Sequence, residues 1–287
     1  MCIDFGPWAA KESESIEVGT KHRKKETGTP GLLVLVPVFN EGPHVKEILT
    51  GIRQYTAADI LVVNDGSTDD SLARIRESDV THVINHEKNV GPGGALISGF
   101  RLATERHYRV LIAMDADGQH EARDIPRFLE AIKDVDVVVG SRYLPDSERR
   151  NTPPKHREWA SGVLTRLVRQ YTSYDITDCA SGFRAYKVSA LRKLNLTEKG
   201  YAWPFQFWIQ AALAGLRVKE IPIALIYFQS EEDSRGESKL IRRTVSYCRW
   251  VMQREMRSAE PNPWRRVWWL LKERFFLLIS NLFLTLF

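Results

Sequence analysis

Short apolar runs alternate with longer amphipathic segments between Gly31 and Arg142. The runs are rich in β-branched residues and have the length of single strands; they cover residues 32–36, 60–63, 82–84, 110–114 and 135–139. Apolar residues recur at helical spacing in the segments between them, at residues 44–55, 69–76, 93–106 and 124–133. Because parallel strands require long crossover connections, this order predicts an α/β fold with a mainly parallel sheet and helices on both faces.

Polar residues follow each of the five predicted strands. The segments read PVFNE, NDGSTDD, NHEKNVGPGG, DADGQH and GSRY in chain order. Asn, Asp, Gly and Pro are common turn formers, so any one of these segments alone could be an ordinary turn. Ligands of open α/β sheets bind beyond the carboxyl ends of the strands, where all five segments would meet. The sequence therefore predicts one shared site at that edge of the sheet.

Asp115 and Asp117 stand two positions apart at the end of the fourth predicted strand. Side chains alternate along a strand, so both carboxylates are expected to point the same way. Such a pair serves either acid–base catalysis or the binding of a hard divalent cation. The side-chain oxygen of Gln119 favours the cation, and we expect Mg²⁺ or Mn²⁺ here. His120 is expected to support this group rather than to act as a base.

The neighbouring loops suit a nucleoside diphosphate. A bound cation would neutralise the diphosphate, and Asp65 can accept hydrogen bonds from a base or a ribose. The loop at Gly91 opens a helix whose backbone N–H groups favour anions. The GPGG sequence fits neither the dinucleotide fingerprint nor the P-loop spacing, which disfavours a dehydrogenase or an ATPase.

The second half of the sequence is less regular. A polar, proline-containing stretch at residues 143–154 predicts a long loop of the kind that often binds ligands. We expect helices at residues 159–171, 205–214 and 239–257 and a strand at residues 220–228. The 3 cysteines are too few for a disulfide framework or a zinc site, which favours a reducing, cytoplasmic setting.

Positive charge is concentrated near the C-terminus. Residues 235–274 hold 11 Lys and Arg against 4 Asp and Glu, which favours a local anionic surface as partner over nucleic acid. Residues 275–287 carry no charge but fall short of the roughly 20 apolar residues that a spanning helix needs. Trp264, Trp268 and Trp269 precede them and favour a helix that lies in one membrane leaflet. The alternative is packing on the domain's own core or on a second subunit.

The motifs VPVFNE, VNDGSTD, NVGPGGAL, DADGQH and GSRY, in this order, resemble those of glycosyltransferase family 2, with its nucleotide-sugar-binding GT-A fold. The likeness is closest to the branch of dolichol-phosphate mannosyltransferases and polyprenyl-phosphate glycosyltransferases. The segments HREWAS, DCASGFR and GESKL of this sequence also resemble signatures of that branch. The likeness spans residues 31–239. We therefore expect a mobile polar tail at residues 1–30, a GT-A domain at residues 31–238 and membrane-associating basic and apolar helices at residues 239–287.

The resemblance implies roles for individual residues. Those that bind the nucleotide sugar would be Pro37, Phe39, Asn40, Glu41, Asp65, Gly91, Asp115, Ala116 and Asp117. The metal ligands would be Asp115, Asp117 and Gln119, and the catalytic residues Asp117, Arg142 and Asp178. The acceptor phosphate would be bound by Arg142, Arg157, Ser161, Arg235 and Lys239. The chain departs from the family pattern with Phe39 for a tyrosine, Asp233 for an arginine and Trp208 for an acidic residue.

The resemblance also implies an activity. It is the metal-dependent, inverting transfer of a hexose, mannose or glucose, from GDP-mannose or UDP-glucose to a dolichyl or undecaprenyl phosphate. The enzyme would be peripheral or monotopic at the cytoplasmic side of the membrane. One alternative is a family member that uses a soluble or growing glycan hydroxyl as acceptor and so needs a committed carboxylate base. The other is a non-catalytic nucleotide-sugar-binding membrane scaffold, against which the intact Asp115, Asp117 and Gln119 set speaks.

Overall fold

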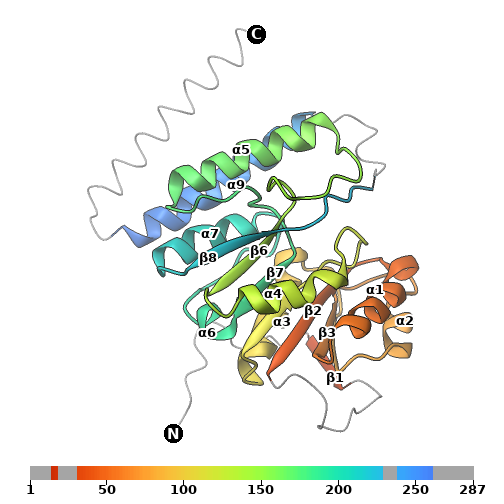
Figure 1. Ribbon diagram of the computed structural model, residues 1–287. Coiled ribbons are helices and arrows are strands. Elements are labelled where there is room, and N and C mark those ends of the chain that lie inside the picture. The colour runs from red at the N-terminus through yellow and green to blue at the C-terminus, as the bar shows by residue number, and fades with distance from the viewer. Residues whose placement is uncertain (1–13, 19–30, 229–237, 261–287) are drawn as a thin grey trace, which may run out of the picture.

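The computed structural model describes residues 14–18, 31–228 and 238–260 (Figure 1). Eight strands form one sheet in the order β1-β4-β3-β2-β5-β7-β6-β8. The strands are β1 (Glu14–Val18), β2 (Leu32–Val38), β3 (Asp59–Asn64), β4 (His82–His86), β5 (Val110–Ala113), β6 (Val137–Ser141), β7 (Arg184–Lys187) and β8 (Val218–Pro222). Parallel pairing joins β4, β3, β2 and β5, and also β6 and β8. The sheet is mainly parallel, as the sequence predicts.

Helices cover both faces of this sheet. They are α1 (Gly42–Tyr55), α2 (Ser71–Glu77), α3 (Pro92–Glu105), η2 (Ala122–Asp124), α4 (Ile125–Ala131), α5 (Lys155–Tyr171), α6 (Val188–Leu191), α7 (Trp203–Leu213) and α9 (Ser238–Ala259). Alternate residues of β2 face opposite sides: Leu33 and Leu35 join one core with α3, α6, α7 and α9, whereas Val34 and Val36 join another with α1, α2 and α4. The period-2 burial of a strand covered on both faces thus produces two cores.

Two strands were not predicted. β7 runs antiparallel between β5 and β6, and its four residues follow directly on the turn-rich sequence DCASGF, which masks the strand pattern. β1 pairs antiparallel with β4, so residues 14–18 belong to the sheet rather than to a mobile tail. The expectation of a tail was wrong at these positions because an edge strand needs only backbone pairing and shows little apolar pattern. The rest of residues 1–30, up to Pro30, lies outside the described residues.

The predicted strand at residues 220–228 is shorter and earlier in the structure. It ends at Pro222, whose ring nitrogen has no hydrogen to donate. The apolar residues that follow instead lie under the loop predicted at residues 143–154: Leu225 N donates to Glu148 O at 2.8 Å, and Arg150 N donates to Leu225 O at 3.2 Å. The long loop is therefore tied to the main domain.

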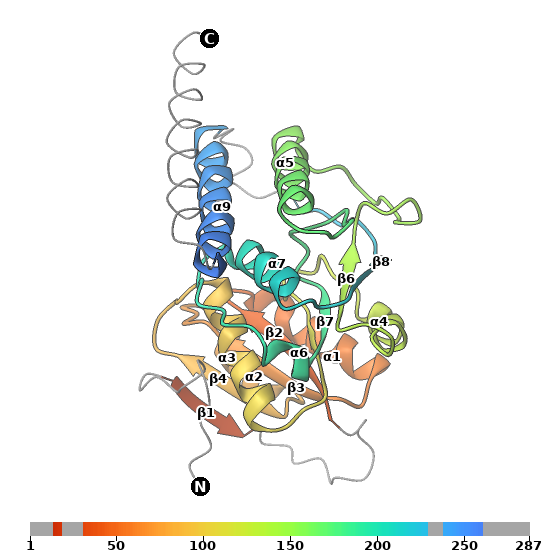
Figure 2. The ribbon, with the colours of Figure 1, turned by 90° about the vertical axis from the view of Figure 1, so that its left-hand side faces the viewer.

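The helix predicted at residues 239–257 is confirmed as α9. Figures 1 and 2 show α5 and α9 side by side, and α9 packs on the domain through Cys248, Val251 and Met252, all buried. None of the helices in the described ranges is both long enough and apolar enough to cross a membrane. The apolar residues 275–287 and the three tryptophans before them lie outside the described residues.

Candidate active site

The loops that follow β2 and β3 are tied together at the carboxyl edge of the sheet. Asn40 adopts a left-handed backbone conformation, with φ 57°. Its backbone N–H donates to Ser67 Oγ at 3.0 Å, and its side-chain oxygen accepts from Thr68 N at 2.8 Å. Glu41 N donates to Ser71 Oγ at 2.9 Å. Two of the segments predicted to share one rim therefore meet there.

Asp65 joins the third of these loops. Its buried carboxylate accepts hydrogen bonds from Val90 N at 3.0 Å and Gly91 N at 2.9 Å, and it contacts His86 Nδ1 at 2.7 Å. Gly91 has φ 99°, and a Cβ there would lie 2.5 Å from Lys199 O, so only glycine fits. The two N–H groups just before α3 thus bind the chain's own carboxylate, and Gly94 N, in the first turn of the helix, donates to Lys199 O at 3.0 Å. A contact of Asp65 with a nucleotide stays a prediction.

Asp115 and Asp117 lie directly beyond β5, in a turn that ties them in place. Asp115 N donates to His120 Nδ1 at 3.1 Å, and Gln119 N donates to Asp117 Oδ1 at 2.9 Å. Burial lowers the pKa of His120 to about 4, so its ring is neutral at pH 7 and Nδ1 is free to accept that bond. His120 also stacks on Phe183 with ring centroids 5.2 Å apart. It therefore supports the Asp115 backbone, as expected.

The aspartate pair fits a divalent cation. Removal from water raises the pKa of both carboxyls, and the negative charge of Asp115 raises the pKa of Asp117 further. Two carboxylates that disfavour each other's ionisation gain most from a cation between them. Within the described ranges no three His, Cys, Asp or Glu residues form a metal cluster. Mg²⁺ is usually bound through one or two carboxylates plus water and substrate phosphate, so this set suits it.

Glu41 adds a third carboxyl group to the site. Burial, followed by the charges of Asp117, Asp69 and Asp115, raises the pKa of Glu41 to about 7. Glu41 and Asp117 both line a pocket of about 640 Å³, together with His120 and Phe228. The pocket opens beside the aspartate pair and gives a ligand room to reach it.

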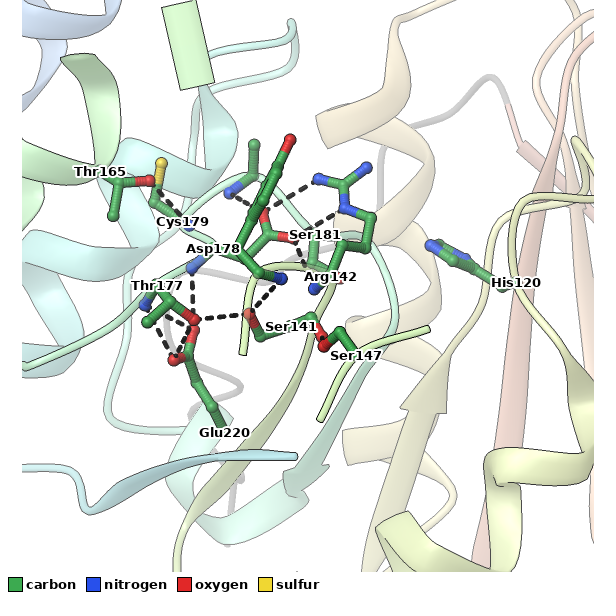
Figure 3. A network of polar contacts seen from close by, with 12 residues as sticks. His120, Ser141, Arg142, Ser147, Thr165, Thr177, Asp178, Cys179, Ser181 and Glu220 are labelled. Atoms are coloured by element: carbon green, nitrogen blue, oxygen red, sulfur yellow. Dashed lines mark hydrogen bonds and ion pairs between the residues drawn. The ribbon is translucent and has the colours of Figure 1, made fainter. Parts of the chain in front are cut away.

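Arg142, just beyond β6, supplies the positive charge. Its guanidinium binds the Asp178 carboxylate with Nε–Oδ2 at 2.7 Å and Nη2–Oδ1 at 3.0 Å (Figure 3). Asp178 is fully buried, whereas the Arg142 side chain keeps 19% of its surface exposed. The same ion pair lowers the pKa of Asp178 and raises the pKa of Arg142, in each case against the effect of burial. Asp178 therefore holds Arg142 and is shielded from a bound substrate.

The turn into β7 closes the site from below. A Cβ on Gly182 would collide with the Asp115 carboxylate, so the backbone there lies against this predicted metal ligand. Arg184, fully buried, donates from Nε to Ser181 O at 2.7 Å and from Nη2 to Cys179 O at 2.8 Å. The segment DCASGFR, which resembles a family signature, thus packs against the Asp115 carboxylate at Gly182.

The other acceptor-side residues are only partly described. Ser161 lies on α5 and hydrogen-bonds the hydroxyl of Tyr143, whose ring lies 5.9 Å from the Arg142 guanidinium carbon. Arg157 lies in the first turn of the same helix and is exposed. The structure thus brings Ser161 to Tyr143, the chain neighbour of Arg142. Arg235 lies outside the described residues, as does the side chain of Lys239, although its backbone is part of α9.

The remaining predicted donor residues line the same edge. Pro37 is the last residue but one of β2, Ala116 is buried between the two aspartates in the sequence, and Phe39 leaves 45% of its surface exposed. Trp208, in the position where the family has an acid, is fully buried and donates from Nε1 to Cys179 O at 2.8 Å. This departure from the family pattern therefore supports the segment that carries Asp178.

Sequence reasoning missed several residues that hold the site. His86 contacts both Asp65 and Ser98, at 2.7 Å and 3.0 Å. Glu220, on β8, binds the backbone at Thr177 and Asp178. His86 is a polar residue that is buried in its strand, and that contrast is a signal that could have identified it, whereas β8 is mostly not buried and gives no such signal for Glu220.

Comparisons with known proteins identify the family. Its profile, described as Glycosyl transferase family 2, matches residues 33–194. The chain is 34% identical over 219 residues to the undecaprenyl-phosphate mannosyltransferase of Micrococcus luteus, a match that covers 73% of this chain and 87% of that protein. It is 33% identical over 210 residues to the polyprenol monophosphomannose synthase of Mycolicibacterium smegmatis, covering 68% and 77%. The chain therefore belongs to glycosyltransferase family 2.

Solved structures agree on the fold. The chain is similar to glucosyl-3-phosphoglycerate synthase from Mycobacterium tuberculosis in complex with Mg²⁺ and uridine diphosphate, with a TM-score of 0.57 and 18% identity. The match covers 76% of this chain and 78% of that one. The predicted GT-A fold is thereby confirmed.

Proposed function

We propose that this enzyme transfers a hexose from a nucleoside diphosphate sugar to a polyprenyl phosphate, with inversion at the anomeric carbon. The observation that carries the proposal is that a pair of carboxylates and a partly buried arginine lie in one site. Asp115 and Asp117 provide a cation-binding pair, and Asp115 contributes to the electrostatic environment of Arg142. A diphosphate leaving group needs the cation that the aspartate pair would bind, and a phosphate nucleophile needs the positive charge of Arg142. The names of the two relatives support this acceptor class.

On the donor side, the chain's residues bind and orient a nucleotide sugar. Asp115 and Asp117, with Gln119 beside them, would hold Mg²⁺ or Mn²⁺, which when bound stabilises the charge that develops on the departing diphosphate. The tied loops at Asn40 and Asp65 shape the nucleotide site. GDP-mannose and UDP-glucose are the donors we propose to test first, since base and sugar identity depend on the shape of this site.

On the acceptor side, Arg142 would bind the phosphate and align it for attack on the anomeric carbon. A phosphate monoester is largely deprotonated near neutral pH, so the nucleophile needs no strong base. Two candidate bases are engaged within the protein: His120 is buried and bonded to the backbone, and Asp178 is buried and paired with Arg142. A glycan hydroxyl, in contrast, would require a carboxylate poised to take its proton.

A lipid acceptor would bring the enzyme to a membrane surface, and α9 suits such a surface. This helix carries six Lys or Arg residues and one Glu. Tyr247 and Trp250 are 47% and 43% exposed, their rings stack at 5.7 Å, and Arg254 lies over the Trp250 ring. Exposed aromatic rings with nearby arginines are typical of residues at the lipid headgroup level. We propose peripheral or monotopic association at the cytoplasmic side.

The proposal is tested by donor screening. Purified enzyme is incubated with radiolabelled nucleotide sugars, polyprenyl phosphate and Mg²⁺ or Mn²⁺, and the products are extracted into organic solvent. We expect label in the lipid phase for one donor and its loss when EDTA is added. Label in the lipid phase for none of the donors would refute the lipid acceptor, and calorimetric binding of nucleotide without turnover would favour a non-catalytic scaffold.

A further inference from the structure

Glu220 lies behind the acceptor side of the site, on the strand next to β6. Its carboxylate accepts hydrogen bonds at both oxygens (Figure 3). Oε1 accepts from Asp178 N at 2.9 Å. Oε2 accepts from Thr177 N and from Thr177 Oγ1, each at 2.8 Å. One side chain therefore anchors two consecutive peptide units.

The first of these peptide units leads to Arg142 through Asp178. Because Asp178 N is held by Glu220, the Asp178 carboxylate is placed under the guanidinium, where it makes the two short bonds to Nε and Nη2. The same carboxylate also accepts from the backbone N–H of Arg142 at 3.2 Å. Asp178 thus fixes both the side chain and the backbone of Arg142, and Glu220 fixes Asp178.

Thr177 provides a second connection between Glu220 and the backbone around Arg142. Thr177 Oγ1 donates its hydrogen to Glu220, so the 2.6 Å contact between Ser141 Oγ and Thr177 Oγ1 has Ser141 as donor. Ser141 Oγ in turn accepts from Tyr143 N at 3.1 Å. Ser141 and Tyr143 are the two chain neighbours of Arg142. The network therefore holds the backbone on both sides of this arginine.

We infer that Glu220 is a positioning residue for the acceptor phosphate: through Thr177 and Asp178 it sets the Arg142 guanidinium in the orientation that binds the anion. This inference extends the proposed function and rests on it for the identity of the anion. Glu220 touches no substrate. Its effect is to remove the freedom of a long, flexible cation, whose alignment would otherwise cost conformational entropy at each binding event.

Glu220→Gln tests the inference by replacing one carboxylate oxygen with an NH₂ group. Both carboxylate oxygens face a backbone N–H, so the amide NH₂ of glutamine opposes a donor whichever way it is turned. We expect the KM for polyprenyl phosphate to rise about tenfold, the scale of one hydrogen bond to a charged group. The affinity for the nucleoside diphosphate with Mn²⁺, measured by calorimetry, should stay unchanged. Equal loss on both sides of the site would contradict the inference.

Two further variants separate positioning from general destabilisation. Thr177→Val removes only the hydroxyl link and should raise the acceptor KM less than Glu220→Gln does, and Thr177→Ser, which keeps the hydroxyl, should restore it. Glu130→Gln is the matched control, because Glu130 is an exposed carboxylate on α4 that pairs with Lys133. It should leave both constants unchanged. In an Arg142→Lys background, Glu220→Gln should add little, and a full additional tenfold loss would overturn the inference.

The geometry can be measured without turnover. The Nε–H of Arg142, donated to the fully buried Asp178, should give a slowly exchanging ¹⁵N nuclear magnetic resonance signal in wild-type protein and a rapidly exchanging one in Glu220→Gln. An unchanged signal overturns the positioning role. If wild-type enzyme labels no polyprenyl phosphate but Glu220→Gln still loses this protection, the proposed function fails while the positioning role stands.

Discussion

At the residue scale, the proposed chemistry of the site depends on the paired aspartates Asp115 and Asp117. Asp115 and Asp117 lie just beyond the end of β5, and burial raises the pKa of both carboxyls. Their proposed ligand role follows from carboxylate chemistry, which is local to the sequence, whereas the strand alternation assumed for them does not apply because β5 ends at Ala113. The partners of Asp65 and Asp178 could not be predicted, because those bonds join loops that are far apart in the chain.

Asp117→Asn should remove one cation ligand while keeping the shape of the turn. We expect turnover to fall by about 100-fold or more, the scale seen when a group that stabilises transition-state charge is removed. Turnover and Mn²⁺ affinity would be measured together, with thermal unfolding to check the fold. Asp134→Asn, an exposed carboxylate, is the matched control and should behave as wild type. Unchanged turnover in Asp117→Asn would remove the metal assignment.

Glu41 predicts a dependence of stability on pH. The fold raises its pKa from 4.5 to about 7, so between these values the folded state binds more protons than the unfolded state. In metal-free buffer, the free energy of unfolding of wild type should therefore decline relative to Glu41→Gln as the pH rises from about 4.5 to about 7. Urea titrations across this range measure the difference. Parallel pH profiles for the two proteins would show that Glu41 is not perturbed.

At the scale of elements, the regular βα units were predictable and the irregular ones were not. The strands of the βα units after Gly31 can be recognised by their apolar runs, because both faces of the sheet are covered. β7 has four residues and follows a turn that serves the site, so its sequence is dominated by that turn. The Asp115 carboxylate lies against Gly182 in this turn, a contact between the segment after β5 and the segment before β7 that only the folded sheet reveals.

Gly182→Ala tests that contact. The added methyl group would displace the Asp115 carboxylate, so we expect Mn²⁺ affinity to fall by about tenfold or more, the scale of disturbing a metal ligand's support. Gly162→Ala on α5 is the matched control, because a Cβ there meets no atom within 4 Å. It should bind Mn²⁺ normally and gain about 0.5–1 kcal/mol of stability. Equal Mn²⁺ affinity in both variants would contradict the role of Gly182.

At the scale of the whole molecule, α9 connects the enzyme to its proposed surroundings. Charge along the sequence indicated a basic C-terminal region, but only the fold shows which face of α9 is buried and which is open. Cys248, Val251 and Met252 face the core, which leaves Tyr247 and Trp250 exposed. Sequence could give the composition of this surface but not its orientation, because orientation depends on packing against α5 and α7.

The surface on α9 predicts membrane binding that depends on these rings. Replacing Tyr247 and Trp250 together by alanine should lower the partition coefficient on anionic vesicles about fivefold or more, because the interfacial aromatic anchors are lost. Vesicle sedimentation measures it. Tyr55→Ala is the control, since Tyr55 is 46% exposed on α1, which packs in the other core. Undiminished sedimentation of the double variant would place the membrane contact elsewhere.

The central claim is that the acceptor is a phosphate recognised by Arg142. The most direct measurement is competition for labelled sugar between polyprenyl phosphate and the matching polyprenol, which differ only in the phosphate, with wild type and Arg142→Ala compared. The account predicts that wild-type enzyme labels the phosphate almost exclusively and that Arg142→Ala loses this transfer. Equal labelling of the two lipids by wild-type enzyme, or retention of the preference without Arg142, would contradict it.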